Sequence, residues 1–404
     1  MSLKETEQRV LGVYETELPS VHIGQDAEAD FLYRKKQREN LFRFALNFPP
    51  ELFANRRLLD LGGGTGDSTI FYGLWGASCT LVDMNPKALA RAQELFESYV
   101  SNDIPQSFMK ESIFDISLED EFDIVVCDGV LHHTEDKKRG FAILSSYLKS
   151  GGYCFLGIGN QAGSFQRNLQ RAILYKFSDS DDEIYSLADQ LFSKHIDRAV
   201  KYGKRSRRAV IYDSYINPKH DSATVDEVLE WFESCRLHLY STYPKILPNI
   251  FCDSPSHASF NKLMTHQAVG QIPELLWMTH NRNDLKSSDK YLGLSQDFEA
   301  PLKALTGAVN DPMPGQELDL EAVEASCAEI DGMIHTLEKA FPVSQELQEF
   351  FREVGSLAAA LRTDDLKIVS STLSNCKTLL TGLHGTSMTY FIGYKDLDNA
   401  STYG

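Results

Sequence analysis

The sequence predicts an α/β protein built on a doubly wound, mainly parallel β-sheet and followed by an all-helical C-terminal extension. An apolar strand runs directly into a glycine-rich turn at residues 58–66 and then into a helix, which is typical of a ligand site beyond the carboxyl end of a parallel strand. Further apolar strand segments alternate with helical segments up to residue 156. Beyond residue 318, three amphipathic segments carry apolar residues at heptad spacing, which predicts helices packed side by side.

The glycine-rich turn has the pattern D-x-G-x-G-x-G and begins at Asp60. Its glycines are Gly62, Gly63, Gly64 and Gly66. A nicotinamide-type fingerprint needs G-x-G-x-x-G, and Asp67 occupies its third glycine position here, so that pattern fails. The turn resembles motif I of the class I S-adenosylmethionine-dependent methyltransferases.

Three further segments resemble this family in the expected order. Residues 79–83 read as a second strand that ends in Asp83, and Asn85 and Pro86 then open a helix. In the family this acid accepts hydrogen bonds from both ribose hydroxyls, as a carboxylate can. Residues 122–133 resemble motif IV and residues 148–156 resemble motif V. The resemblance covers about residues 55–160 and implies a Rossmann-like sheet of seven strands.

The resemblance implies S-adenosylmethionine as the cofactor and a set of residues that bind it. These are Asp60, Gly62, Gly63, Gly64, Gly66, Asp83, Met84, Ser112, Ile113 and Asp128. Ser112 departs from the family, whose members often place an Asp there to bind the adenine amino group; a serine hydroxyl can also accept that bond. Asp60 has a second interpretation, in which it only fixes the turn by accepting backbone N–H groups.

The candidates for catalysis follow the fourth predicted strand. Methyl transfer mainly needs alignment and exclusion of water, and a base is required only when the nucleophile arrives protonated. His132 and His133 are the candidate bases, because imidazole titrates near neutral pH; the alternative is that both are structural. Candidate substrate contacts are Asn160, after the fifth predicted strand, and Asp213, Tyr215 and His220, at the end of an insertion.

Composition and charge restrict the classes of protein that fit. The chain has 404 residues, 42% of them hydrophobic and 24% charged, with a net charge of −17, so nucleic acid is an unfavourable partner. No apolar stretch approaches the ~20 residues of a membrane span, and the charged N-terminus does not read as a signal peptide. Seven cysteines occur singly without a C-x-x-C pair, which predicts a reducing cytoplasm and no metal site. A basic run at residues 201–208 is interpreted as a solvated helix end, or as a contact for an acidic substrate or partner.

Four regions are predicted. Residues 1–50 form an N-terminal helical cover, in which Tyr14 and Tyr33 are either core aromatics or residues that close over the cofactor. The methyltransferase domain spans residues 51–250, with a lid insertion at about 160–222, and an irregular connecting region spans 251–317. Residues 318–395 form a helical bundle whose apolar seams pack within the chain, or form a homodimer contact or a docking surface for a protein partner.

Two classes of function fit these features. The first is a methyltransferase acting on a small molecule or a protein side chain. The second is a catalytically silent S-adenosylmethionine-binding module whose helical tail binds a protein partner. The enzyme is favoured, because the cofactor motifs are intact and the insertion is large enough to form a substrate lid. A dehydrogenase is a distant third, since its dinucleotide fingerprint is missing.

Overall fold

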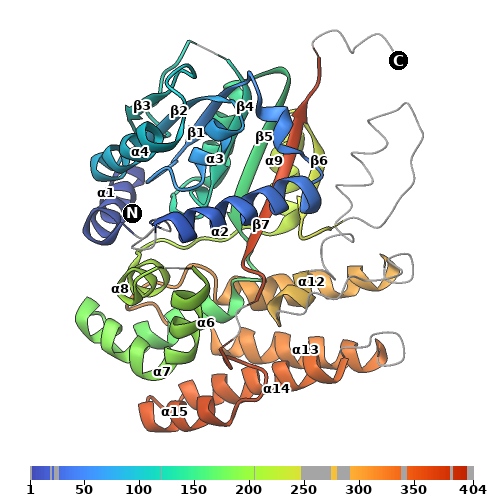
Figure 1. Ribbon diagram of the computed structural model, residues 1–404. Helices are drawn as coiled ribbons and strands as arrows, with labels where there is room; N and C mark the ends of the chain where they lie inside the picture. Colours follow the sequence, from blue (N-terminus) through green and yellow to red (C-terminus); the bar gives the residue numbers. More distant parts are fainter. Residues whose placement is uncertain are drawn as a thin grey trace.

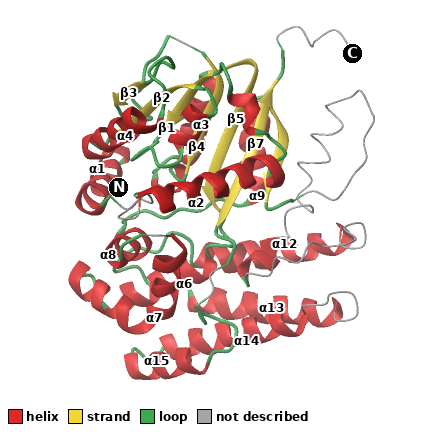
Figure 2. Cartoon of the chain, viewed as in Figure 1, coloured by secondary structure: helices red, strands yellow, loops and turns green. Residues whose placement is uncertain are grey.

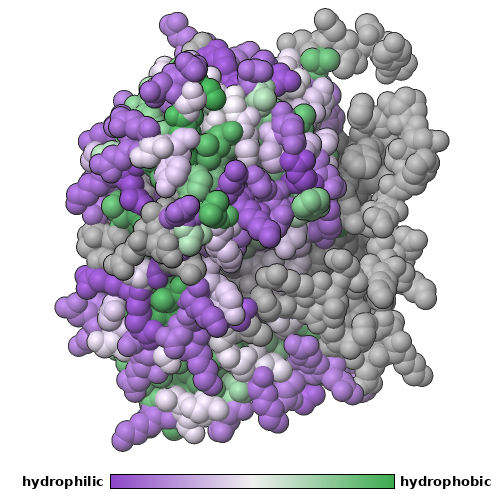
Figure 3. Space-filling model, in the orientation of Figure 1, coloured by the Kyte–Doolittle hydropathy of each residue, from purple (hydrophilic) through white to green (hydrophobic). Residues whose placement is uncertain are grey.

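The computed structural model places a twisted sheet above a layer of helices (Figure 1). The structure describes residues 2–18, 21, 27–119, 121–203, 205–246, 274–279, 292–337, 344–382 and 385–397. Among the helices of these residues, none combines the length and the apolar composition that crossing a bilayer requires. The face shown in Figure 3 is mainly hydrophilic where it is described, with apolar residues scattered over it.

The sheet has seven strands in the order β3-β2-β1-β4-β5-β7-β6. The strands are β1 (Arg57–Leu61), β2 (Ser78–Asp83), β3 (Ser107–Lys110), β4 (Phe122–Asp128), β5 (Leu148–Gly159), β6 (Leu237–Tyr243) and β7 (Met388–Lys395). The pairs from β3 to β5 are parallel, whereas β7 is antiparallel to both β5 and β6. The predicted doubly wound, mainly parallel, seven-stranded sheet is confirmed.

Helices cover both faces of the sheet, because successive strand residues point to opposite sides. Leu58 and Ile124 belong to one hydrophobic cluster, and their chain neighbours Leu59 and Val125 belong to another. The first cluster includes residues of α2 (Ala27–Asn40), η1 (Leu41–Ala45), η2 (Pro50–Phe53), α3 (Thr69–Leu74) and α4 (Pro86–Tyr99). The second includes residues of α5 (Lys137–Ser146) and α9 (Val225–Ser234). Figure 2 shows α2 lying across the front of the sheet.

The helices below the sheet come from two distant parts of the chain. The insertion supplies α6 (Phe165–Phe177), α7 (Asp181–Gly203), α8 (Arg207–Ile211) and η4 (Tyr212–Ile216), and the C-terminal part supplies α12 (Leu292–Ala308), α13 (Leu320–Leu337), α14 (Ser344–Leu361) and α15 (Leu366–Asn375). Both groups share one hydrophobic core, which contains Phe165 and Phe192 from the insertion and Ile330 and Phe350 from the tail. We call these helices the helical layer. The predicted lid and bundle are therefore parts of one packed unit.

The predicted domain boundaries need a correction at the C-terminus. The sheet does not close near residue 250, because β7 comes from residues 388–395 and lies between β5 and β6. The segment 318–395 is therefore a helical region followed by a central strand, and its third helix ends at Asn375. In the region predicted as irregular, residues 292–308 form a helix. The prediction for residues 251–273 and 280–291 lies outside the described residues.

The N-terminal helix α1 (Leu3–Glu17) begins with a capping box formed by Ser2 and Glu5. The Ser2 hydroxyl accepts the Glu5 N–H at 3.4 Å, and the Glu5 carboxylate accepts the Ser2 N–H at 2.8 Å. Side chains tie the helix to the rest of the protein, with Thr6 donating to Glu135 at 2.9 Å. The predicted N-terminal cover thus contains a helix that is attached at its start.

Candidate active site

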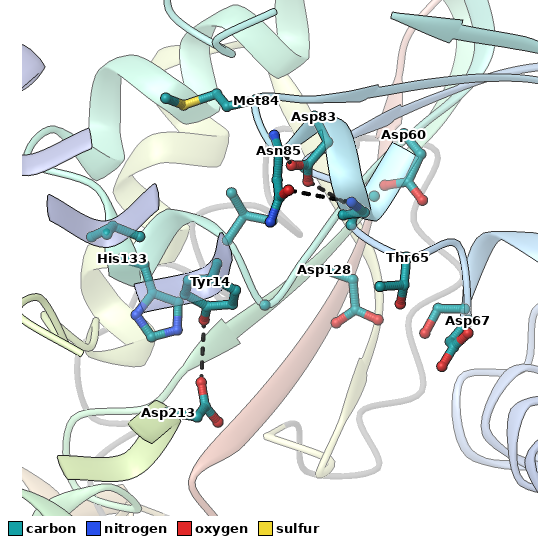
Figure 4. Close-up of a pocket in the computed structure, with 18 of the residues that line it drawn as sticks. Tyr14, Asp60, Thr65, Asp67, Asp83, Met84, Asn85, Asp128, His133 and Asp213 are labelled. Atoms are coloured by element: carbon teal, nitrogen blue, oxygen red, sulfur yellow. Dashed lines mark hydrogen bonds between the residues drawn. The ribbon is translucent and has the colours of Figure 1, made fainter. Parts of the chain in front are cut away.

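A cavity of about 470 Å³ lies where the carboxyl ends of β1, β2 and β4 meet the helical layer. Helices α1 and α2 contribute to its walls through Tyr14 and Arg38. Figure 4 shows Asp60 and Asp83 on one side of this pocket and His133 and Asp213 on the other. The volume is within the range of about 300–1,000 Å³ that is usual for small-molecule sites.

The glycine turn forms one wall of the cavity. Residues packed behind the turn leave no room for a side chain at these positions. Gly62 has φ +79°, and a Cβ built on it would lie 2.5 Å from a Val130 methyl carbon. A Cβ on Gly63 would lie 2.5 Å from Leu81 Cγ. Gly62, Gly63 and Gly64 line the cavity. Gly66 does not line it; a Cβ there would lie 3.0 Å from that of Ala92, so this glycine permits close packing with α4.

We expect Gly62→Ala to destabilise the fold by roughly 2–5 kcal/mol, from left-handed backbone strain together with overpacking against Val130. Gly355→Ala is the matched control, since this α14 glycine has open space around its Cβ position and should gain about 0.5–1 kcal/mol. Urea unfolding followed by circular dichroism measures both. Equal stability of Gly62→Ala and the wild type would contradict this account of the turn.

Two buried acids at the strand ends organise this wall. Asp83 accepts the Gly64 N–H and the Asn85 N–H, each at 2.8 Å. Burial raises the pKa of Asp83, and these two hydrogen bonds oppose the rise. Asp60 accepts the Thr69 hydroxyl at 2.5 Å, and burial raises the pKa of its carboxyl group to about 7. Both acids line the cavity, so Asp60 is placed to contact a ligand as well as Thr69.

Asp128, at the end of β4, forms an ion pair that crosses from the sheet to α2. Its carboxylate is 2.8 Å from Arg38 Nη2, and both side chains are mostly buried. Arg38 also lies over the rings of Phe42 and Phe155, at 5.2 Å from each. Gly157 of β5 is required beside this pair, because a Cβ there would overlap the Asp128 carboxylate. Asp128 lines the cavity, and its negative charge is already balanced by Arg38.

The candidate adenine contacts differ from the prediction at Ser112. Met84 and Ile113 line the cavity, whereas Ser112 does not. The Ser112 hydroxyl donates instead to the Glu7 carboxylate of α1 and accepts the Phe114 N–H at 3.0 Å. Glu7 and Glu111 line the cavity at this position, so a carboxylate is present there from residues that the motif comparison did not select.

His133 is held in one tautomer by its backbone contact. Its Nδ1 lies 2.7 Å from the Lys219 carbonyl oxygen, which can only accept, and 3.2 Å from the Asn217 amide nitrogen; because the carbonyl contact is shorter, we assign the proton to Nδ1. The unprotonated Nε2 is then free to accept a proton. Burial lowers the pKa of His133, with the nearby Asp213 opposing the shift, so the imidazole is neutral at pH 7. His133 lines the cavity, so its Nε2 is the candidate proton acceptor there.

His132 has the opposite tautomer. Its Nδ1 accepts the Gly159 N–H at 3.3 Å, so the neutral ring carries its proton on Nε2. His220 lies beside it, with ring centroids 5.1 Å apart. Both histidines line the cavity and are buried, and burial lowers the pKa of each well below its usual value. His132 therefore presents a donor rather than a base.

Asp213 connects the helical layer with the N-terminal helix. Its carboxylate accepts a hydrogen bond from the Tyr14 hydroxyl at 3.2 Å and pairs with Arg205 at 2.9 Å (Figure 4). Arg205, followed by His133 and Arg167, holds the pKa of Asp213 well below its usual range against the effect of burial. Tyr14 and Asp213 both line the cavity, whereas Tyr33 is 42% exposed on α2. Of the two tyrosines considered from the sequence, only Tyr14 reaches the site.

Two candidate substrate contacts do not line the cavity. Asn160 is buried, donates to Glu274 at 2.8 Å and accepts the Gly163 N–H at 2.8 Å, so it supports the turn after β5. Tyr215 is also buried, and its hydroxyl donates to Gln170 at 3.0 Å inside the helical layer. Both are structural in this fold and are removed from the set of candidate contacts.

Sequence analysis missed four arginines that line the cavity. They are Arg34, Arg38, Arg167 and Arg205. Arg167 and Arg205 belong to the predicted lid insertion, and Arg205 also belongs to the basic run at 201–208, where it points inward to Asp213 rather than into solvent. In the same run, Arg207 pairs with Asp189 and Asp197 of α7. Nothing local distinguishes Arg167 from the other arginines of its amphipathic helix.

Comparison with known proteins supports the motif assignment. The family described as "Methyltransferase domain" matches residues 59–156. A protein of Synechococcus sp. named as uncharacterized is 30% identical over 213 residues, which are 48% of this chain and 50% of that protein. The ubiquinone biosynthesis O-methyltransferase of Aromatoleum aromaticum is 33% identical over 109 residues, which are 27% of this chain and 46% of that enzyme. The chain thus spans about half the length of these relatives.

Solved structures of methyltransferases are also similar to part of the chain. The 1,6-didemethyltoxoflavin-N1-methyltransferase of Burkholderia thailandensis has 18% identity and a TM-score of 0.30, and the similarity covers 40% of this chain and 65% of that one. The family match at residues 59–156 contains the glycine turn, Asp83 and the end of β4, all of which border the cavity. This segment is a class I S-adenosylmethionine-dependent methyltransferase domain.

Proposed function

We propose that the protein transfers a methyl group from S-adenosylmethionine to a small-molecule acceptor. The observation that carries this proposal is that one cavity is lined both by the glycine turn with Asp83 and by the candidate base His133. A small molecule is favoured over a protein side chain, because α1 and the helical layer both border the cavity and leave less room for a protein surface.

The residues present fit the proposed cofactor. The glycine turn lets the backbone approach a ligand closely, and a Cβ at Gly62 or Gly63 would displace this turn by overlapping Val130 or Leu81. Asp83 has a carboxylate already fixed by two backbone N–H groups, with further lone pairs that can accept ribose hydroxyls. Asp60 and Asp128 also line the cavity, where Arg38 balances the charge of Asp128 and burial raises the pKa of Asp60 to about 7. When bound, S-adenosylmethionine supplies an electrophilic methyl group and a good leaving group.

His133 then acts on the acceptor. With the cofactor bound, Nε2 of His133 would accept the proton of the acceptor's O–H or N–H group, while the methyl group would come from S-adenosylmethionine, which would leave as S-adenosylhomocysteine. The Lys219 carbonyl keeps Nδ1 protonated and fixes the ring orientation. Asp213, although paired with Arg205, opposes the lowering of the His133 pKa and so would favour the imidazolium. Tyr14 donates to Asp213 and holds α1 over the site.

The test of the proposed function has two parts. Calorimetry with S-adenosylmethionine and S-adenosylhomocysteine measures cofactor binding. Mass spectrometry for S-adenosylhomocysteine after incubation with a panel of hydroxyl- and amine-bearing metabolites measures turnover. We expect binding and acceptor-dependent turnover. Binding without turnover across a broad panel would favour the silent binding module, and absence of binding would reject both.

Asp83→Asn is expected to weaken S-adenosylmethionine binding by about 1.5–3 kcal/mol, the range for hydrogen bonds to a charged group. Asp103→Asn is the matched control, because Asp103 lies in an exposed turn, where its carboxylate accepts the Ser101 hydroxyl at 3.2 Å and its own N–H donates to that hydroxyl at 3.3 Å. Isothermal titration calorimetry measures both dissociation constants. An unchanged constant in Asp83→Asn, with normal circular dichroism, would remove Asp83 from the cofactor site.

No specific observation favours the alternative in which the tail is a partner-binding surface. The heptad residues Val323, Ile330, Val354 and Leu357 are buried in the core of the helical layer. Those seams are occupied within the chain, so a homodimer through the tail would need another face of these helices.

A further inference from the structure

The part of the cavity bordered by the helical layer contains an unbalanced positive charge. Arg167 of α6 lines the cavity, and its Nε is buried without a hydrogen-bond partner. Within the described part of the chain, no hydrogen bond or ion pair of this guanidinium is found. The neighbouring Arg205 is paired with Asp213, so these two charges cancel and Arg167 remains.

An unpaired guanidinium in such a place is costly. Burial and the nearby Arg205 and Arg171 lower the pKa of Arg167, whereas Asp213 only partly offsets them. A buried charge is normally retained together with a partner. The described carboxylate that acts on Arg167, Asp213, is already paired with Arg205, which leaves room for a ligand anion as the partner of Arg167.

Two histidines add hydrogen-bonding capacity at the same position. His132 carries its proton on Nε2, because its Nδ1 accepts the Gly159 N–H. His220 is buried, and neither of its ring nitrogens has a partner among the described residues. Both rings experience the charge of Arg167. Unsatisfied buried polar groups mark a place where a ligand completes the hydrogen bonds.

We propose that the acceptor carries a carboxylate or a phosphate group, bound by the Arg167 guanidinium and by N–H groups of His132 and His220. This inference rests on the proposed function and names its substrate class. The cavity would then hold the cofactor at the glycine turn and Asp83 and the anionic group of the acceptor at Arg167. With its anionic group bound to Arg167, the acceptor can place its nucleophile, on another part of the molecule, next to His133.

A metal ion is the competing occupant. His132, His133 and His220 each offer a ring nitrogen, and these nitrogens lie within 4.8 Å of one another. Two observations disfavour a cation. The proton on Nε2 of His132 removes the lone pair that would face the cavity, and Arg167 adds a repulsive charge.

The first experiment measures anion binding directly, by equilibrium dialysis with radiolabelled inorganic phosphate, with and without saturating S-adenosylhomocysteine. Phosphate should bind the wild type, and Arg167→Met should weaken binding roughly 10- to 100-fold. Arg167→Lys keeps the positive charge but lacks the paired N–H donors of the planar guanidinium, so it should recover part of the phosphate affinity that Arg167→Met loses. Arg198→Met is the matched control, because Arg198 is exposed on α7 over the Tyr202 ring, and it should bind as the wild type does. Circular dichroism checks that each variant is folded.

The second experiment uses acceptors in matched pairs, each acid with its methyl ester, and measures S-adenosylhomocysteine formation. The acid of a productive pair should have the higher kcat/KM, and Arg167→Met should remove that preference mainly through KM. Equal turnover of acid and ester by the wild type would overturn the inference while leaving methyl transfer intact.

The remaining outcomes separate the two proposals. Phosphate binding that depends on Arg167, without any binding of S-adenosylhomocysteine, would support the anion site and reject the proposed function. S-adenosylhomocysteine binding without phosphate binding, or phosphate binding unchanged in Arg167→Met, would overturn the anion site. Stoichiometric binding of Zn²⁺ alone that is lost in His220→Ala would replace the anion with a metal.

Discussion

Replacing His133 by glutamine is expected to lower kcat by about 10²–10⁴-fold, the usual contribution of a general base. The reason is the tautomer, since the Lys219 carbonyl 2.7 Å from Nδ1 leaves Nε2 of His133 as a proton acceptor. Affinity for S-adenosylmethionine should stay within about 1 kcal/mol of the wild type, because Asp83 and the glycine turn bind the cofactor. Calorimetry and steady-state kinetics on the acceptor found by screening measure the two quantities.

His132→Gln separates the base from its neighbour. The amide N–H₂ of glutamine can replace the Nε2–H donor of His132, so this variant should lose far less of kcat than His133→Gln. His238→Gln is a control outside the site, since His238 lies on β6 and contacts Asp396 at 2.6 Å. If His132→Gln and His133→Gln lower kcat equally, the tautomer argument fails. If neither variant lowers kcat, the alignment of the two substrates accounts for catalysis without a base.

The same assignment determines the direction of the pH dependence. Burial lowers the pKa of His133 below its ordinary value of about 6.5, and the base must be neutral. The kcat should therefore be flat from pH 8 down to about 6.5 and fall only at lower pH, as the imidazole becomes protonated. A wild-type kcat that already declines between pH 8 and pH 7 would contradict a lowered pKa at the catalytic base.

Phe391→Asp is expected to prevent folding of the whole protein rather than to loosen its tail. Phe391 is 1% exposed in the middle of β7, packed in the cluster that includes Leu156 of β5 and Phe232 of α9. The variant loses about 3–5 kcal/mol of aromatic packing and adds several kcal/mol for a buried unpaired charge. This total loss is comparable with the usual free energy of unfolding of a protein, about 5–15 kcal/mol.

Phe391→Ala keeps this prediction measurable if the aspartate variant does not express. It should lower the free energy of unfolding by about 3–5 kcal/mol, and cofactor binding should be lost in the same urea transition as the secondary structure. Leu397→Ser, at a side chain 60% exposed just beyond the strand, should change stability by less than about 0.5 kcal/mol. Cofactor binding that survives after the tail has unfolded would show that the sheet does not need β7.

The methyltransferase segment could be predicted from sequence because its signals are local. A strand, a turn and a helix are adjacent in the chain, so the glycines and Asp83 identify both the fold unit and its ligand side without knowledge of distant contacts. The tautomers of His132 and His133 could not be predicted. They depend on the Gly159 N–H and the Lys219 carbonyl, which lie 27 and 86 residues away in sequence.

The sequence by itself determined the parallel sheet, the order of its motifs and the amphipathic character of the C-terminal helices. The tertiary structure decided which faces meet. Heptad spacing reveals an apolar seam but not its partner, so only the fold shows that the tail and the insertion share one core. The position of β7 between β5 and β6 also depends on long-range strand pairing. Arg167 likewise becomes distinctive only in the folded protein, where Arg205, His132 and His220 lie near it. Such sites depend on contacts between segments far apart in the chain, and the residues of one segment do not specify them.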